Sequence, residues 1–246
     1  MTKSDEGFVA SKGWLDIFKH QHGIRRLKIT GEKLSSNESA IEPFRIELLR
    51  FINQKNLSAE QMYNADESGL FWRMLRNKTL ADHYEKVVSG RKSIKVRITF
   101  TPCANATGKH KPSLFVAGTA KKSRTFKSVM LPLCYRGQKN AWATRELFLD
   151  WFKTEFVPAV QQLMKSINLP QRALLLLDNC PGNPSAEELC TDDDEIFAMF
   201  LHPNTTALIQ PMDHNAIQNI KLEYRKLLLT NILNDPVHIE NLGKKH

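Results

Sequence analysis

The sequence predicts an α/β protein in which helices flank a mixed sheet of antiparallel and parallel strands. Three observations predict this class. Residues 62–120 contain three short apolar stretches separated by polar and turn-forming residues, which is typical of an antiparallel meander. Residues 173–177 form a continuous apolar run, as in a strand buried on both faces of a sheet. Two longer segments, 144–169 and 214–233, carry apolar residues at helical spacing.

Residues 1–30 contain a short amphipathic helix. Ser11 is a suitable N-cap, Gly23 is a suitable stop, and Trp14 and Ile17 belong to an apolar face. One short helix is not stable alone, so this segment is predicted to be part of a small helical unit. Its basic side chains, which we expect to contact nucleic acid, are Lys12, Lys19, His20, Arg25, Arg26 and Lys28.

Residues 31–58 are predicted to be a polar linker followed by a helix. Ser39 and Glu42 have the spacing of a capping box. Apolar residues then continue at helical spacing to about Asn56.

The three stretches of the meander come next. The first, residues 62–72, has an acidic centre, so we expect Asp66 in mid-strand and Glu67, as a salt-bridge partner, on the opposite face. The second alternates charged and apolar residues up to Phe100 and then reaches an Asn/Gly turn, and the third spans residues 112–120.

The second half of the chain predicts a helix, two strands and a closing helix. Pro158 is expected to kink the helix at 144–169. The strand at 173–177 ends on Asp178, and a further short strand ends before Pro203. The apolar positions expected of the closing helix are Ile217, Ile220, Leu222, Leu227 and Leu228.

Asp178 stands where a buried strand reaches the carboxyl edge of the sheet, which is where α/β folds bind ligands. A carboxylate there is costly without a partner, because burial disfavours its charge. Two partners are consistent with the sequence: a cation, or the amide groups of the turn at 179–184.

Two more acids favour the cation. Asp66 lies in the first strand, and Asp213 lies where the closing helix begins, although a helix N-terminus also favours an acid for purely local reasons. Three carboxylates that converged on one edge would repel each other unless divalent cations neutralised them. Oxygen ligands of this kind suit Mg²⁺ or Mn²⁺.

The chain is basic, with 35 Lys and Arg against 26 Asp and Glu and a formal net charge of +9. A positive surface attracts polyanions, so DNA is the expected partner, with RNA as an alternative. No apolar run approaches the length of a membrane span, and the oligomeric state stays open. A second basic group flanks the predicted strand ends and is expected either to bind phosphates or to form a solvated rim: Lys109, Lys111, Lys121, Lys122 and Arg124.

Four ordered segments carry a resemblance to a known family. "YNADESGLFWRMLRNKTL", "CANATGKHK", "LLLLDNCPGNP" and "HPNTTALIQPMDHNAIQNIK" resemble the pogo/Tigger-type transposase-derived proteins, and most of all their Jerky-like members. "ASKGWLDIFKHQHGI" resembles the end of the centromere-protein-B-type helix-turn-helix that precedes the catalytic domain in that family.

The resemblance implies a ribonuclease-H-like fold that holds two Mg²⁺ or Mn²⁺ ions on an acidic triad and cuts DNA in the nucleus. Carried over by position, the triad is Asp66, Asp178 and Asp213. The implied domains are the last part of a helix-turn-helix at 1–30, the linker and helix at 31–58, a DDE-type domain at 59–230 and a tail at 231–246.

The sequence departs from the family pattern near these acids. Arg76 and His202 each stand where proline is usual, Asn183 stands where histidine is usual, and His214-Asn215 stands where Gln-Gly is usual. Changes beside metal ligands can lower affinity or activity about 10–100-fold.

Three functions are therefore weighed. The first is a metal-dependent endonuclease of the transposase type. The second is a domesticated or truncated copy that binds nucleic acid without cutting it. The third is a small-molecule phosphohydrolase with Asp178 as nucleophile, which is disfavoured because Cys180 stands where that chemistry needs a second aspartate.

Overall fold

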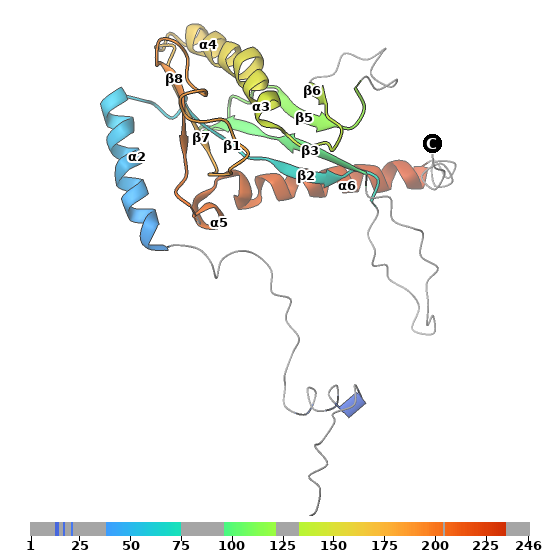
Figure 1. The fold of residues 1–246 in the computed structure, drawn as a ribbon. Helices are drawn as coiled ribbons and strands as arrows, with labels where there is room; N and C mark the ends of the chain where they lie inside the picture. Colours follow the sequence, from blue (N-terminus) through green and yellow to red (C-terminus); the bar gives the residue numbers. More distant parts are fainter. Residues whose placement is uncertain are drawn as a thin grey trace, which may run out of the picture. The chain divides into compact units, whose positions relative to one another are not determined.

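The computed structural model divides the chain into two units, Met1–Leu34 and Ser35–His246. In the first unit the described residues 13, 14, 17 and 21 are helical, within the predicted helix. The basic residues Lys12, Lys19, His20, Arg25, Arg26 and Lys28 lie outside the described residues, as do Arg76, Lys122, Arg124 and the end of the chain from 235. In the second unit the structure describes residues 38–74, 96–121, 133–203 and 205–234 (Figure 1).

The second unit begins with a 3-10 turn, Glu38–Ala40, followed by helix α2, Ile41–Lys55. Ala40 takes the N-cap position of this helix, one residue after Ser39, from which the capping box was expected. The left-handed residue Asn56 ends it, as a C-terminal asparagine often does.

Eight strands form two four-stranded sheets. The first has the order β4-β1-β7-β8, in which β1, β7 and β8 are parallel and β4 is antiparallel to β1. As predicted, the leucine run at 173–177 is a buried strand with parallel neighbours on both sides. The bounds are β1 Met62–Ala65, β4 Cys103–Asn105, β7 Ala173–Leu177 and β8 Ile196–Phe200.

The second sheet has the order β2-β3-β5-β6. The predicted antiparallel meander is confirmed for β2, β3 and β5. Strand β6 pairs parallel to β5 and was not predicted, because its short mixed sequence "LCYRG" carries no clear alternation. The bounds are β2 Ser68–Phe71, β3 Arg97–Thr101, β5 Leu114–Gly118 and β6 Leu133–Gly137.

The two sheets meet where one strand pair is interrupted. Ala65 pairs with Cys103 and Ser68 pairs with Phe100, so the same antiparallel register continues across the break. Pro102 lies in the gap and has no N–H to donate, which interrupts the ladder there. The Asp66 N–H still donates to the Pro102 carbonyl, at 3.4 Å. Asp66 therefore lies at the interruption between β1 and β2, and not in mid-strand as predicted.

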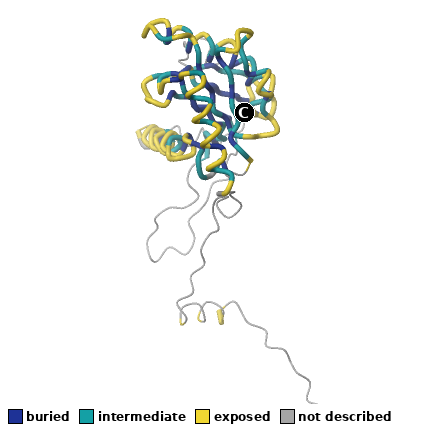
Figure 2. Tube along the Cα trace, turned by 90° about the vertical axis from the view of Figure 1, so that its left-hand side faces the viewer, coloured by how far each residue is buried: buried dark blue, intermediate teal, exposed yellow. Residues whose placement is uncertain are grey.

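The predicted helix at 144–169 covers one face of the sheets (Figure 1). It consists of α3, Arg145–Trp151, a π-helical turn, Phe152–Phe156, and α4, Val157–Ser166. The widened turn comes just before Pro158, which lacks the N–H of a regular helix. Aromatic side chains of this helix form the centre of the main core, and Figure 2 shows the buried residues gathered in the middle of the unit.

The closing helix packs on the other face (Figure 1). It follows α5, Thr206–Ile209, and a kinked π turn, Met212–Ala216, and α6 itself spans Ile217–Asn234, beyond the expected domain end at residue 230. Its first turns bury Met212 and Ile217 against the second sheet. The expectation for the other apolar positions was largely wrong, because Leu228 is only half-buried and three side chains are exposed: Ile220, Leu222 and Leu227.

None of the helices within the described parts of the chain combines the length and the apolar character needed to cross a lipid bilayer.

Candidate functional site

Strands β1 and β7 place two of the three acids at one edge of the first sheet. The strands are parallel neighbours, and Asn64 is paired with Leu176. Asp66 and Asp178 both follow these paired residues by two positions, so they leave adjacent strands side by side. Asp213 comes from the kinked turn that precedes α6.

The three carboxyl groups act on one another electrostatically. Burial, followed by the charges of Asp213 and Asp178, raises the pKa of Asp66 to about 7. Burial and the charge of Asp213 also raise the pKa of Asp178, against a hydrogen bond from Asn183 that lowers it. The three predicted acids are thus near enough for their charges to influence one another, with Asp66 buried and Asp213 exposed to solvent.

Glu67 is a fourth acid at this site. Burial, followed by the charges of Asp178 and Asp66, raises its pKa to about 8, while Arg97 acts in the opposite direction. The expected salt bridge of Glu67 is not formed with any residue in the described ranges. Sequence reasoning missed its proximity to Asp178, since the only signal was an acid directly next to Asp66 at a strand interruption.

A buried pair of side-chain amides connects the segments that carry the three acids. The amide nitrogen of Asn64, on β1, donates to Gln210 Oε1 at 2.6 Å and to the carbonyl oxygen of Leu176, on β7, at 3.0 Å. The Asn64 amide oxygen accepts the backbone N–H of Met212 at 3.0 Å. Gln210 in turn donates to the carbonyl oxygen of Ala65 at 3.3 Å.

Each of these contacts lies one to three residues before an acid. Asn64 and Ala65 precede Asp66, Leu176 precedes Asp178, and Gln210 and Met212 precede Asp213. Gln210 is fully buried and Asn64 is nearly so, which makes their hydrogen bonds costly to break. We therefore regard this amide pair as the contact that fixes where the three carboxylates stand.

Asn183 orients the second acid. Its amide nitrogen donates to both the backbone oxygen and the Oδ1 atom of Asp178, each at 3.1 Å. One of the two partners considered for Asp178, an amide of the following turn, is thus present. Because Asn183 donates to Asp178 Oδ1, the lone pairs that Asp178 can offer to a cation lie mainly on its other carboxylate oxygen.

The donor set suits a hard divalent cation, because it consists of carboxylate oxygens. Burial, followed by the charges of the neighbouring acids, raises the pKa values of Asp66 and Asp178, and a positive ion would offset both effects. Among the described residues, no three His, Cys, Asp or Glu side chains are already arranged around one ion position. The acids are therefore grouped more openly than in a preformed metal cage.

Two of the predicted phosphate-binding residues, Lys109 and Lys111, lie away from these acids. The turn that carries Lys109 and Lys111 joins the opposite end of β1, where Ala106 donates its N–H to the Met62 carbonyl. Lys109 forms an ion pair with Glu60 at 3.6 Å, and Lys111 donates to the Gly108 carbonyl at 2.7 Å.

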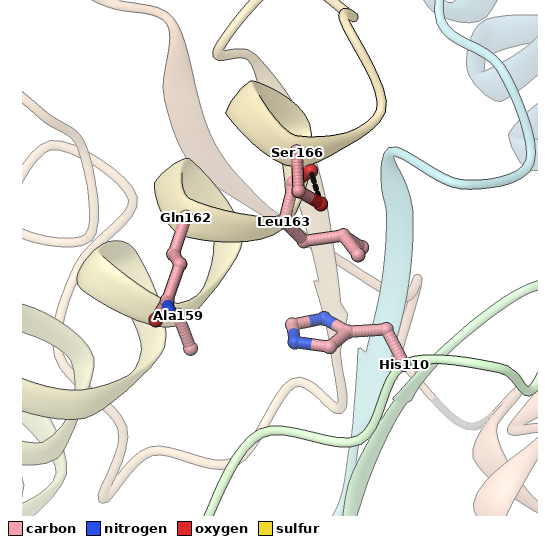
Figure 3. A pocket seen from close by; sticks show the side chains of 5 residues that line it. All are labelled: His110, Ala159, Gln162, Leu163 and Ser166. Atoms are coloured by element: carbon pink, nitrogen blue, oxygen red, sulfur yellow. Dashed lines mark hydrogen bonds between the residues drawn. The ribbon is translucent and has the colours of Figure 1, made fainter.

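A hollow of about 250 Å³ lies beside this turn and faces α4 (Figure 3). It contains no acid, so it is separate from the carboxylate site. Its residues are His110, Ala159, Gln162, Leu163 and Ser166. Lys121 belongs to the same predicted basic group as Lys109 and Lys111. It follows the end of β5 by three positions and is exposed.

Comparison with known families gives a direct match. Residues 95–246 match the model of the family described as DDE superfamily endonuclease. The chain belongs to this family. The matched region of the DDE family includes Asp178 and Asp213, while Asp66 lies before it.

Relatives among curated proteins confirm the transposase-derived resemblance. Tigger transposable element-derived protein 7 of Homo sapiens is 39% identical over 225 residues, which cover 89% of this chain and 41% of that protein. The Jerky protein homolog of Homo sapiens is 39% identical over 238 residues, covering 96% of this chain and 40% of that protein. CENP-B homolog protein 2 of Schizosaccharomyces pombe is 28% identical over 92% of this chain. The chain spans about 40% of the length of the first two relatives.

Solved structures support the ribonuclease-H-like fold of this DDE-family chain. The Mos1 mariner paired end complex with Mn aligns over 86% of this chain and 57% of that one, with a TM-score of 0.51 and 12% sequence identity. A pre-cleavage Mos1 transpososome gives the same coverage and TM-score at 9% identity.

The structure describes the surroundings of three residues that depart from the family pattern: Asn215, His214 and His202. Asn215 stands where the family usually has glycine, and its backbone has a φ of 75°. Asparagine is among the few residues other than glycine that tolerate positive φ. His214 Nε2 lies 2.9 Å from the Leu208 carbonyl, to which it can donate. His202 instead contacts α2, 3.3 Å from Glu47, and its ring packs against Phe44.

Replacing Asp66 with Asn should change how stability depends on pH. The raised pKa means that folded Asp66 keeps a proton which the unfolded chain loses above about pH 4, so this group weakens folding as the pH rises towards 7. Asp66→Asn should therefore be more stable than the wild type at pH 7.5, by an amount on the order of 2 kcal/mol. The difference should shrink towards pH 4. Urea unfolding at several pH values measures it, with exposed Glu223→Gln as control; a difference that grows towards pH 4 would contradict the assignment.

Replacing Asn64 should lower the stability of the folded protein, and replacing Asn64 and Gln210 together should cost less than the two single losses added. Asn64→Leu leaves Gln210 and the Met212 N–H without their partner in a buried place, and should lower the free energy of unfolding by about 2–4 kcal/mol. Gln210→Met should also destabilise the protein. The double variant should lose clearly less than the sum of the two, since they share one hydrogen bond. Additive losses in urea unfolding would show that the amides act independently.

Substitutions at Asn215 should follow its positive φ. Asn215→Gly should leave stability unchanged or raise it slightly, whereas Asn215→Val should lower it by about 1–2 kcal/mol. Thermal unfolding of both variants tests this. A glycine variant that is less stable than the valine variant would rule out backbone strain as the reason for asparagine here.

Proposed function

We propose that this chain is the catalytic-type domain of a transposase-derived protein, in which Asp66, Asp178 and Asp213 hold Mg²⁺ or Mn²⁺ and support cleavage of a DNA phosphodiester. The observation that carries the proposal is the placement of the three acids: Asp66 and Asp178 leave adjacent parallel strands side by side, and hydrogen bonds to Asn64 tie the turn of Asp213 to β1. Acids held this close reduce stability unless a cation binds them, so a fixed arrangement of this kind is better explained by cation binding than by folding alone.

Each residue would contribute differently to the bound state. Asp66 is buried at the end of β1 and would provide the most rigid ligand. Asp178 is oriented by Asn183, which acts on the carboxylate without contacting substrate. Asp213 is exposed and would face the side from which a phosphate enters. When bound, divalent ions of this type activate water and neutralise charge on the phosphate.

The proposed partner is DNA, and the proposed location is the nucleus. The net charge of +9 favours a polyanion. Relatives are named as transposable element-derived and CENP-B homolog proteins, and the structural neighbours include a Mos1 mariner paired end complex and a pre-cleavage Mos1 transpososome. Since one neighbour contains Mn and the acids supply hard oxygen ligands, a divalent cation is the proposed cofactor.

A second candidate function keeps the fold and omits the cleavage. The observation that favours it is the open grouping of the acids, in which the described residues form no ready-made ion cage. In that case the protein would bind DNA as a regulator.

Metal binding should be measurable as stabilisation. At about 100 times its dissociation constant, Mn²⁺ should stabilise the folded chain by about 2.7 kcal/mol and raise Tm by several degrees. Asp178→Asn should remove most of this shift. Asp192→Asn, which changes an exposed acid in a loop, is the matched control and should keep it. An equal shift in all three proteins would place the ion elsewhere.

Cleavage should require the same acids. In a plasmid-nicking assay with Mn²⁺, the wild type should convert supercoiled to open-circular DNA, and Asp178→Ala should reduce the rate at least 100-fold, as expected when a metal ligand of a hydrolytic centre is removed. Equal nicking by both proteins would reject catalysis at this site. A thermal shift without nicking would support the regulator instead.

A further inference from the structure

A second hollow, of about 310 Å³, lies along the first turns of α6 and includes one of the acids. Asp213 stands at its border, and the other residues come from one face of the helix. They are Ile217, Gln218, Lys221, Leu222 and Arg225. The hollow therefore combines two cationic side chains with apolar and amide groups, directly beside the carboxylate site.

Lys221 is fixed in this hollow from the sheet side. Its Nζ atom donates to Ser68 Oγ at 2.7 Å, and Ser68 opens β2 only two residues after Asp66. Among the described residues, no carboxylate lies within ion-pair distance of Lys221. An ammonium group has three N–H donors, so two remain available for a ligand.

Arg225 lies one helical turn further along the same face. Burial and the charge of Arg225 lower the pKa of Lys221, while Asp213 and Asp66 act in the opposite direction. Two cations at this spacing repel each other, which is unfavourable for an isolated helix. The described residues offer Arg225 no ion-pair partner either. An anion bound between the two side chains would attract both of them and offset their repulsion.

The neighbouring residue Lys226 provides an internal comparison. It pairs with Glu223 on the same helix, with 3.6 Å between Nζ and Oε2, and both side chains are exposed. Glu223, the acidic residue of α6, is thus paired with Lys226 and not with either cation of the hollow. The two cations that line the hollow keep their charge available.

We propose that this hollow binds a backbone phosphate of the DNA strand that enters the carboxylate site, with Lys221 and Arg225 as its ligands. The inference rests on the proposed function, because it takes DNA as the substrate. The exposed apolar side chain of Leu222 would contact the adjoining sugar.

The salt dependence of DNA binding tests the proposal without requiring cleavage. A fluorescent 30-base-pair duplex of random sequence is titrated with the 246-residue chain in EDTA, at several NaCl concentrations, and the slope of log K against log salt is measured. Loss of one phosphate contact lowers the magnitude of this slope by about 0.9. We expect that decrease, with weaker binding, for both Lys221→Gln and Arg225→Gln. Lys226→Gln removes the same charge from the same helix and should keep the wild-type slope.

The outcomes separate this inference from the proposed function. If the wild type binds the duplex and both hollow variants keep its slope, the phosphate site is wrong while DNA binding stands. If Lys226→Gln lowers the slope as much as the hollow variants do, the effect is general charge, and the site is also wrong. If the wild type does not bind DNA, the proposed function fails first. Thermal unfolding checks each variant, and Arg225→Gln decides the result if Lys221→Gln does not fold.

Discussion

The buried contact between Asn64 and Gln210 is the interaction on which the candidate site depends. It joins a strand of the sheet to the turn before the closing helix, across 146 positions of sequence. The burial of Met212 and Ile217 against the second sheet supports the same turn, so Asp213 is held near Asp66 and Asp178 despite the repulsion between their charges. An amide pair suits this task, because it is neutral and can be satisfied completely in a dry interior.

The interruption at Pro102 gives the first acid its place. A regular ladder would commit the backbone of Asp66 and Glu67 to the sheet, with their side chains on opposite faces. The missing N–H interrupts the pairing while the register continues on both sides. Asp66 is then buried and its neighbour Glu67 half-buried near Asp178, and this partial burial raises the pKa of Glu67 to about 8. The cationic hollow on α6 lies beside this concentration of negative charge, so the site has both an acidic and a basic side.

The departures from the family pattern are milder than their positions suggest. Asn183 still donates a hydrogen bond to Asp178, as a histidine could. Asn215 adopts the positive φ for which glycine is usually selected. His202, in contrast, contacts α2, where it affects packing and not the acids. These local chemistries explain how a DDE-family chain can keep its acidic site while its surrounding residues change.

The sequence by itself determined the buried strand at 173–177, the antiparallel meander and the two long helices, since each follows from the period of its own apolar residues. It also pointed to Asp66, Asp178 and Asp213, through the motifs that surround them. Only the tertiary structure decided strand β6, the partial burial of Glu67, the exposure of Leu227 and the contact of Asn64 with Gln210. The physical reason is that burial and hydrogen bonding between distant segments depend on which surfaces meet, and local sequence patterns carry no record of that partner.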